Sequence, residues 1–486
     1  MRDNSIEDII AGQNIRESLI DLKNDLDDNE ELKNEQLFES LKVLLKDDNP
    51  KIRTNSAIVL GHFKKSTVRT VLLQAYHDEV IDYAKEGYLK GLSYQNCKPI
   101  IDELKTIQVE LTNSTDVDKK HVQAQLKVLN PLVRSYASHK KKMVRLLHKD
   151  VDVILTTLPY YQFTLFDYVK NYKYKPVARG VLVRTKSVYD LLSIRNYRDM
   201  IIPLRHCTRM AKDANEIVAC LARSNLMDLL DNLFDSSGSF YYKLSDHSRN
   251  ADSSLTTQII KGLLEVFPNK LLNVTRNYEI EIILEEVRDD KVNAYLSLSI
   301  LDNPRFDYHK EVISNSMQPF VAATILETAK NYMKPHAKVL DPFCGSGITL
   351  IERCLMKPPK FAIGIDIYAK GLDAAKRNSR AANVNAHYIN KNTLRFVNSE
   401  MFDEIVTDMP TLQQMKDHTE LTRLYDAFFR RIHRLVASGG YCFIYTSEIQ
   451  LVQKNLRLNR DYLTLQDHYE VPRGRKMHYF FIIQVR

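Results

Sequence analysis

The chain has 486 residues, of which 44% are hydrophobic and 27% are charged. This composition is that of an ordinary globular protein and disfavours a disordered one, and the length exceeds one hydrophobic core, so about three or four domains are expected. The net charge of +8 is compatible with an anionic partner but does not require one.

The N-terminus and the cysteines bear on location and metal content. The first 22 residues are acidic and polar and lack the apolar core of a signal peptide, and no stretch approaches the length of a transmembrane helix. We therefore predict a cytoplasmic protein without a membrane contact. The six cysteines show no CxxC pair and no cluster at zinc spacing, so we expect mostly buried thiols and no metal.

Residues 35–135 alternate amphipathic helix patterns with short polar breaks. Two segments that start at Asp47 and His77 look related, and each predicted helix ends at a glycine, Gly61 or Gly91, a common C-cap residue. The first segment resembles a HEAT-type repeat in its D-x-P-x-hydrophobic-Arg opening. The resemblance implies stacked helical repeats over 1–137 that offer a surface to a protein partner. A generic helical bundle is the alternative.

The segment from Ser138 to Lys186 is strongly basic. Tyr172 and Tyr174 are interleaved with its lysines, a mixture that suits contact with phosphates and stacked bases. A solvated surface is the alternative interpretation of such a charge run. We predict RNA binding through Lys140, Lys141, Lys142, Lys173, Lys175 and Arg179.

Strand and helix patterns then alternate as far as Leu301. The order of elements over 146–205 resembles the ferredoxin-like module found beside THUMP domains. The strand, helix and hairpin patterns over 206–303 resemble the THUMP domain itself, which grips acceptor-stem-like RNA. The resemblance implies an α+β middle region that binds RNA, with tRNA as the first expectation.

The segment KVLDPFCGSGITLIE, from Lys338 to Glu352, predicts a strand, a turn and a helix. The strand ends at Asp341, and Gly345 and Gly347 allow the turn to approach a ligand without a Cβ in the way. In a doubly wound sheet a ligand lies beside this first turn. No lysine follows in the P-loop arrangement, and the glycine spacing is not G-x-G-x-x-G, so a nucleoside triphosphate and a dinucleotide are both disfavoured.

The next predicted strand ends at Asp366, whose carboxylate can accept hydrogen bonds from both hydroxyls of a ribose; a helix N-cap is the alternative role. Together these motifs resemble the S-adenosylmethionine site of Rossmann-like methyltransferases, and DPFCGSG followed by IE resembles the THUMP-associated RNA methyltransferases. The resemblance implies a Rossmann-like domain over 312–486 with S-adenosylmethionine as cofactor. It implies a cofactor site of Asp341, Phe343, Cys344, Gly345, Gly347, Asp366, Ile367, Asn392 and Thr393.

Two further segments fit or modify this resemblance. The stretch around Ser316 and Pro319 resembles the family's linker, in which a serine and a proline open a helix into the cofactor domain. Asn392 takes the place of the acidic residue that touches the adenine amino group in the family. Its amide can accept a hydrogen bond from that amino group or donate one to a ring nitrogen.

The segment MFDEIVTDMP predicts a strand that ends in D-x-P. An exocyclic base amine is a poor nucleophile because its lone pair is delocalised, so an enzyme must hold that nitrogen and aim it at the methyl group. Asp408 can accept one N–H and a backbone carbonyl near Pro410 the other, and both are predicted catalytic residues.

In the family an aromatic residue follows this motif and stacks on the base, but this chain has Thr411. Three explanations remain open. The base is stacked by another residue such as Tyr445, the substrate is unusual, or the domain binds its ligands without methylating.

The sequence thus predicts a multidomain protein with an all-α HEAT-like solenoid, an α+β ferredoxin-like and THUMP-like middle, and an α/β Rossmann-like methyltransferase domain. By resemblance the product is N2-methylguanosine in tRNA, with ribosomal RNA as second choice. One alternative is a methyltransferase of DNA adenine N6. The other is an RNA-binding or assembly protein that retains the fold without catalysis.

Overall fold

The structure, a computed structural model, describes residues 2–25, 34–114, 119–136, 142–235, 238–249, 251–268, 270–274, 277–313, 316–474 and 476–486. The chain divides into two compact units. Unit 1 comprises Met1–Lys142, Ala211–Ala222 and Asp235–Glu281, and unit 2 comprises Met143–Met210, Arg223–Phe234 and Ile282–Arg486. No helix in these described ranges is long and apolar enough to cross a membrane.

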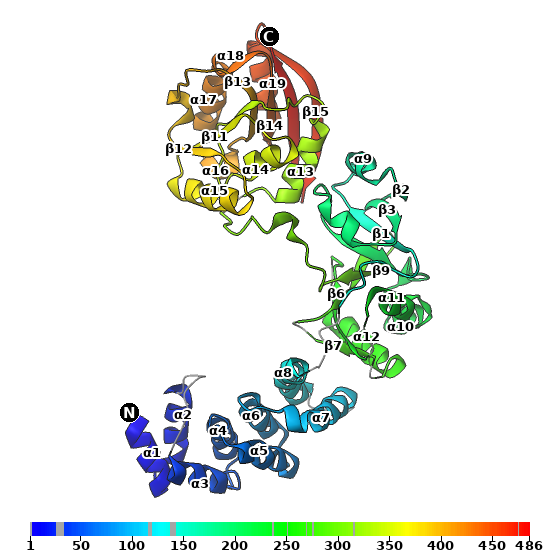
Figure 1. The fold of residues 1–486 in the computed structure, drawn as a ribbon, viewed down its shortest axis with the longest axis vertical. Helices are drawn as coiled ribbons and strands as arrows, with labels where there is room; N and C mark the ends of the chain where they lie inside the picture. The colour runs from blue at the N-terminus through cyan, green and yellow to red at the C-terminus, as the bar shows by residue number, and fades with distance from the viewer. Residues whose placement is uncertain are drawn as a thin grey trace. The chain divides into compact units, whose positions relative to one another are not determined.

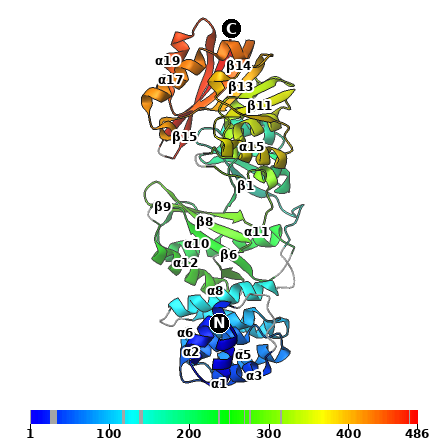
Figure 2. The same ribbon diagram turned by 90° about the vertical axis from the view of Figure 1, so that its left-hand side faces the viewer.

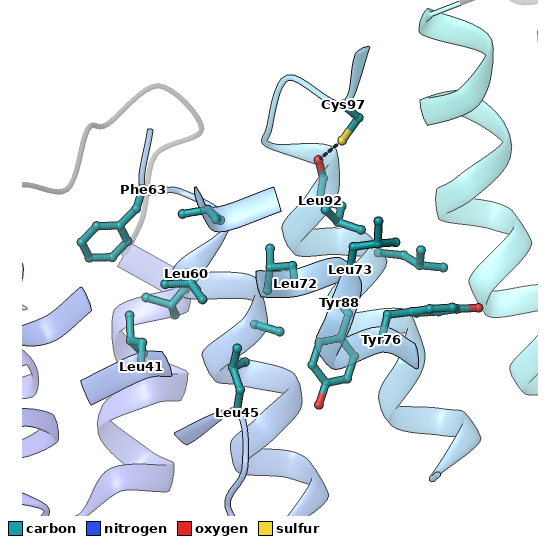
Figure 3. Packing of buried hydrophobic residues seen from close by; sticks show 14 of the residues in the cluster. Leu41, Leu45, Leu60, Phe63, Leu72, Leu73, Tyr76, Tyr88, Leu92 and Cys97 are labelled. Carbon is teal, nitrogen blue, oxygen red and sulfur yellow. Dashed lines mark hydrogen bonds between the residues drawn. The ribbon is translucent and has the colours of Figure 1, made fainter. Parts of the chain in front are cut away.

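The N-terminal part of unit 1 is helical, as predicted. Its elements are α1 Arg2–Ala11, α2 Ile15–Asp25, α3 Glu35–Leu44, α4 Pro50–Leu60, α5 Ser66–Asp78, α6 Asp82–Ser93, η1 Lys98–Ile100, α7 Ile101–Asn113 and α8 Lys119–Ser135. The helices bury their apolar faces in one continuous cluster, part of which Figure 3 shows around Leu60, Leu72 and Tyr88. Helix α4 packs between α2 and α6, and α6 packs on α8.

The prediction that Gly61 ends a helix is confirmed, whereas the same prediction for Gly91 is wrong. Gly61 is the C-cap of α4 but has an ordinary right-handed φ of −58°, and Gly91 lies inside α6. A Cβ at Gly61 would lie 2.4 Å from the carbonyl oxygen of Gly91. The two glycines therefore allow the backbones of α4 and α6 to touch, and Gly87 does the same against Thr54.

We expect Gly61→Ala to lower the stability of the helical region by about 1–3 kcal/mol, because the added methyl group overpacks a backbone contact. The right-handed φ of Gly61 is open to alanine, so the loss would come from packing alone. Thermal unfolding would measure it, with Lys51→Ala on the exposed face of the same helix as a control of unchanged Tm. An unchanged Tm for Gly61→Ala would show that the two helices can move apart at no cost.

The middle of the chain is α+β. In unit 2 the hydrogen-bonded strand order is β2-β3-β1-β4-β9-β8. The elements there are β1 Val151–Thr156, η2 Gln162–Leu165, α9 Phe166–Val169, β2 Lys173–Val177, β3 Gly180–Thr185, η3 Tyr189–Ser193, β4 Met200–Pro203, α11 Leu226–Leu233, β8 Ile280–Val287, β9 Lys291–Leu298 and η4 Pro304–Phe306.

Unit 1 also contains elements from the middle of the chain. These are α10 Ala214–Arg223, β6 Phe240–Asp246, α12 Ser253–Val266 and β7 Leu271–Asn273, with the short β5 Met210–Ala211 at its start. Strand β6 pairs in parallel with β7. The strand and the helix of the pattern predicted over 206–303 are present as β6 and α12. Helices α10 and α11 were not predicted.

The C-terminal part of unit 2 contains a seven-stranded sheet of order β12-β11-β10-β13-β14-β16-β15. Strands β10 to β14 run parallel, and β16 lies antiparallel between β14 and β15. The strands are β10 Lys338–Asp341, β11 Phe361–Asp366, β12 His387–Asn390, β13 Phe402–Asp408, β14 Val436–Thr446, β15 Leu463–Arg473 and β16 Lys476–Val485. The predicted Rossmann-like sheet and its closing antiparallel hairpin are both present.

Helices cover both faces of this sheet (Figures 1 and 2). They are α13 Pro319–Thr328, α14 Ile348–Met356, α15 Ala369–Ala381, η5 Thr393–Arg395, α16 Leu412–Met415, α17 His418–Phe429, α18 Ile432–Leu435 and α19 Ile449–Leu458. Successive strand residues alternate between the two cores, because side chains along a strand point to opposite faces. Val406 packs with α13 and α14, whereas its neighbour Ile405 packs with α17 and α18.

A buried polar cluster fixes helix α14 to the rest of unit 2. Glu352, on α14, accepts hydrogen bonds from the Arg195 guanidinium at 2.7 and 2.9 Å and from the Tyr308 hydroxyl at 2.6 Å. Its side chain is only 1% exposed. The glutamate of the predicted DPFCGSG…IE motif therefore has a structural role, holding the helix that follows the turn.

Candidate functional site

A cavity of about 900 Å³ lies at the carboxyl ends of β10, β11 and β13. Strand β10 is central, with β11 on one side and β13 on the other, so the strand order reverses here, and ligands bind at such a point in open α/β sheets. Seven of the nine predicted cofactor residues line it: Phe343, Cys344, Gly345, Asp366, Ile367, Asn392 and Thr393. Both predicted catalytic residues, Asp408 and Pro410, line it too.

The turn after β10 is held by backbone hydrogen bonds. The N–H of Cys344 donates to the Ile365 carbonyl at 3.0 Å, and the N–H of Gly345 donates to Asp366 Oδ2 at 2.8 Å. Gly345 has φ +48° and Gly347 has φ +81°, values that favour glycine. A rigid turn with this shape exposes its backbone to the cavity.

Asp341 and Gly347 do not line the cavity and support the turn instead. Asp341 is 1% exposed, and its Oδ1 accepts from Phe343 N–H at 3.1 Å and from the Thr407 hydroxyl at 2.8 Å. Burial raises the pKa of Asp341 to about 8. A Cβ at Gly347 would lie 2.8 Å from the Tyr388 hydroxyl oxygen, so its glycine permits close packing rather than ligand approach.

Asp366 ends β11 and keeps capacity for a ligand. Its Oδ1 accepts from the N–H of Tyr368 at 2.8 Å, and its Oδ2 accepts from Gly345. Each carboxylate oxygen has a further lone pair, so two hydroxyl groups can still be received. Ile367 beside it is 74% exposed and gives the cavity an apolar wall.

Asn392 and Thr393 begin the short helix η5 at the cavity wall. Asn392 Oδ1 accepts from the N–H of Leu394 at 2.9 Å, so of its two predicted roles donation by the amide NH2 group is the freer one. Thr393 is 5% exposed, and its hydroxyl oxygen has no hydrogen-bond partner among the described residues. A buried hydroxyl without a partner beside a cavity is suited to binding a polar ligand atom.

Asp408 ends β13 in the same cavity. Burial raises its pKa to about 7, and the nearby Arg473 opposes this rise. The carbonyl of Pro410 accepts a hydrogen bond from the Tyr425 hydroxyl at 3.0 Å, and Met409 N–H donates to the Tyr445 carbonyl at 2.9 Å. The D-x-P backbone is thus fixed by its neighbours, which gives Asp408 a defined position.

Tyr445 is not available to stack on a base, contrary to the suggestion from sequence. It is fully buried, and its ring stacks on His478 with centroids 5.2 Å apart. Thr411 begins helix α16, where it forms a capping box with Gln414. The position after D-x-P therefore caps a helix here.

Helix α17 and its C-cap residue supply cavity residues that sequence reasoning missed: Glu420, Arg423, Leu424, Ala427 and Arg430. Their spacing of three and four residues marks one helix face, but periodicity does not say what that face meets. The linker contributes too, since the hydroxyl oxygens of Ser316 and Ser346 lie 2.7 Å apart. Helix α13 begins at Pro319, in agreement with the predicted domain entry.

The predicted RNA-binding residues are only partly gathered. Lys140 and Lys141 lie outside the described residues, and Lys142 is exposed in unit 1. Lys173 and Lys175 are exposed on β2, the edge strand of its sheet in unit 2. A lysine-rich edge strand also prevents pairing with other chains, so its charge has a second explanation.

Arg179, in the turn after β2, has less freedom to bind phosphate. Its guanidinium forms an ion pair with Glu285 at 2.5 Å and lies 5.3 Å from the centre of the Tyr295 ring. Arg184 lies opposite Lys173 in the strand register and is paired with Asp152 at 2.7 Å.

One protein-family model matches the part of the chain that forms this cavity. Residues 308–467 match the family described as an RMKL-like methyltransferase domain. These residues, about a third of the chain, are similar to that methyltransferase domain. Such a domain implies S-adenosylmethionine as cofactor, which confirms the predicted cofactor. A comparison with curated proteins gives no match.

Solved structures share the fold of this chain. TrmN from Thermus thermophilus is 19% identical with a TM-score of 0.53, and the match covers 69% of this chain and 100% of TrmN. SMU.472, a putative methyltransferase complexed with SAH, is 13% identical with a TM-score of 0.54 and coverages of 69% and 98%. A predicted N6-adenine-specific DNA methylase from Listeria monocytogenes is 14% identical with a TM-score of 0.53 and coverages of 68% and 96%.

Proposed function

We propose that the protein is an S-adenosylmethionine-dependent RNA methyltransferase that acts on an exocyclic base amine. Guanosine N2 in tRNA is the first choice and ribosomal RNA the second. The observation that carries the proposal is that Asp408 and Pro410 line the same cavity as the turn after β10 and Asp366. Methyl transfer to an amine requires that the group that holds the amine and the turn that holds the cofactor share one cavity.

The residues present fit the cofactor. Asp366 would receive the ribose hydroxyls, Ile367 would contact the adenine ring, and the amide of Asn392 would donate to a ring nitrogen. The turn from Phe343 to Ser346 would hold the methionine half. The bound cofactor would supply an electrophilic methyl group on a positively charged sulfur.

Asp408 has two tasks in this scheme. Its carboxylate accepts one N–H of the base amine, which fixes the nitrogen and aims its lone pair. Transfer of a methyl group to a neutral amine leaves a positive charge on the nitrogen until a proton departs. A carboxylate with a pKa of about 7 can take that proton near neutral pH.

RNA is favoured as substrate by the middle of the chain. The exposed Lys173 and Lys175 provide positive charge next to Tyr174, which is 38% exposed. Mixed basic and aromatic surfaces suit single-stranded or bulged RNA. The resemblance of 146–303 to ferredoxin-like and THUMP-like modules points in the same direction, with the helical repeats left to bind a protein partner.

Two other functions compete with this one. The Listeria structure is named as a predicted DNA methylase, so duplex DNA is a necessary second substrate in any activity assay. The lack of an aromatic residue at Thr411 favours a protein that keeps the fold for binding alone. The buried Thr393 hydroxyl, to which no described residue is hydrogen-bonded, argues for a cofactor site that is still in use.

We expect Asp366→Ala to weaken S-adenosylmethionine binding at least tenfold. The unmodified protein should bind in the micromolar range, about −8 kcal/mol, and the variant loses the ribose acceptor together with the anchor of Gly345. Isothermal titration calorimetry would measure both. Asp373→Ala, on the exposed face of the following helix, is the matched control with unchanged affinity. Equal affinities for the two variants would contradict the assigned site.

A further inference from the structure

A second pocket of about 230 Å³ adjoins the cofactor cavity. The two share Asp408 and Gln414 as lining residues. The remaining lining residues of this second pocket are Thr411, Gln413, Arg473, Lys476 and His478. Its volume is below the range of sites for drug-sized ligands, so it has room for one small group such as a nucleobase or a phosphate.

The second pocket has opposite charges from different elements. Asp408 comes from the end of β13, while Arg473 and Lys476 flank the turn between β15 and β16. Arg473 reaches the Ser316 carbonyl only at 3.5 Å, and Lys476 reaches Gln413 Oε1 only at 3.4 Å. Within the described ranges neither cation forms a salt bridge, so both retain donors for an anion.

The wall of the second pocket contains a buried polar atom for which the described part of the chain provides no hydrogen-bond partner. His478 lines it at 9% exposure, and its Nδ1 has no hydrogen-bond partner in the described structure. Burial, together with Arg473 and Lys476, lowers the pKa of His478 to about 4, so the ring is neutral at pH 7. Such atoms in a native fold call for a ligand or a water.

We propose that the second pocket holds the base of the nucleotide to be methylated, with its amine at Asp408, and that Arg473 and Lys476 contact the backbone phosphate of this nucleotide at the pocket's rim. This inference rests on the proposed function. A nucleotide carries both an N–H donor and an anion, which matches the opposite charges among the residues that line the pocket. Charge-assisted contacts to phosphate are about twice as strong as neutral ones and would hold the nucleotide where Thr411 provides no ring for stacking.

The test removes both cations without touching the cofactor cavity. In Arg473→Gln/Lys476→Gln, the dependence of log K for a fluorescent tRNA on log salt should become shallower by about one to two units, since each lost phosphate contact accounts for about 0.7 to 0.9. The KM for RNA should rise about tenfold or more with cofactor affinity unchanged, measured well above pH 7, because loss of Arg473 would raise the pKa of Asp408 further. Arg457→Gln/Arg460→Gln, which removes two exposed charges at α19 and the turn after it, is the matched control and should change neither quantity.

A charge-retaining variant, Arg473→Lys/Lys476→Arg, should restore most of the salt dependence of RNA binding. This result would show that the glutamine variant loses charge and not its fold. The proposal is overturned if the glutamine variant matches the control in both slope and KM, or if the unmodified chain does not bind RNA. If the chain binds RNA but transfers no methyl group to it, the proposed function fails. In that case the salt dependence of RNA binding still tests, on its own, whether Arg473 and Lys476 contact phosphate.

Discussion

Replacing Asp408 with alanine is expected to lower methyl transfer about 100-fold or more while leaving cofactor binding within about twofold. The carboxylate is the acceptor that fixes the base amine, and removal of one well-placed polar group from a reacting centre costs roughly 10²–10³ in rate. Asp366 and the turn after β10, which would hold the cofactor, remain in place. Single-turnover transfer of a labelled methyl group would measure the rate, and calorimetry the affinity.

Asp408→Asn is the matched control, because an amide keeps one acceptor oxygen and the same shape. The pKa of Asp408 is raised to about 7 by burial, so the unmodified enzyme should lose activity as pH falls below 7 and the carboxylate takes up a proton. The asparagine variant should retain some activity but lose this acid limb. Loss of cofactor binding in the alanine variant, or full activity in it, would contradict the role of Asp408.

The features of the site that were predictable from sequence are those that depend on neighbours in the chain. A strand followed by a glycine turn is recognisable in DPFCGSG because the residues that shape it are adjacent. Asp366 and Asp408 lie at strand ends, as their sequence pattern indicates: each ends an apolar run, and the carboxyl ends of parallel strands meet at one edge of the sheet.

The features that sequence did not reveal depend on long-range pairing. Strand β16 lies between β14 and β15, and the pairing of Tyr445 with Phe480 brings the β15–β16 turn to the end of β13. No local pattern shows that Arg473 will lie close to Asp408. Gly91 illustrates the same limit. In the sequence it looks like a helix end, whereas its contact with Gly61 arises from helix packing.

The support beneath the site includes a buried ion pair between α14 and β13. Arg353 Nε donates to Glu404 Oε2 at 2.6 Å, and both side chains are 0% exposed. The guanidinium also donates to the Lys334 carbonyl at 3.1 Å, and Glu404 Oε1 accepts from Lys334 N–H at 2.7 Å. Strand β13 carries Glu404 and Asp408, and α14 follows the cofactor turn, so this pair connects the two halves of the site.

We therefore expect Glu404→Ala to destabilise the methyltransferase domain by about 3–5 kcal/mol, because it leaves the Arg353 charge buried without compensation. For a domain of this size the corresponding loss of Tm is roughly 10 °C, measurable by calorimetry. Glu400→Ala is the control, since its ion pair with Lys338 lies at the surface, where such pairs contribute little to stability. The double variant Arg353→Met/Glu404→Leu should recover much of the loss, because apolar side chains can replace a buried ion pair with little cost. A double variant as unstable as Glu404→Ala would show that the two side chains stabilise the domain through their separate backbone contacts and not through each other.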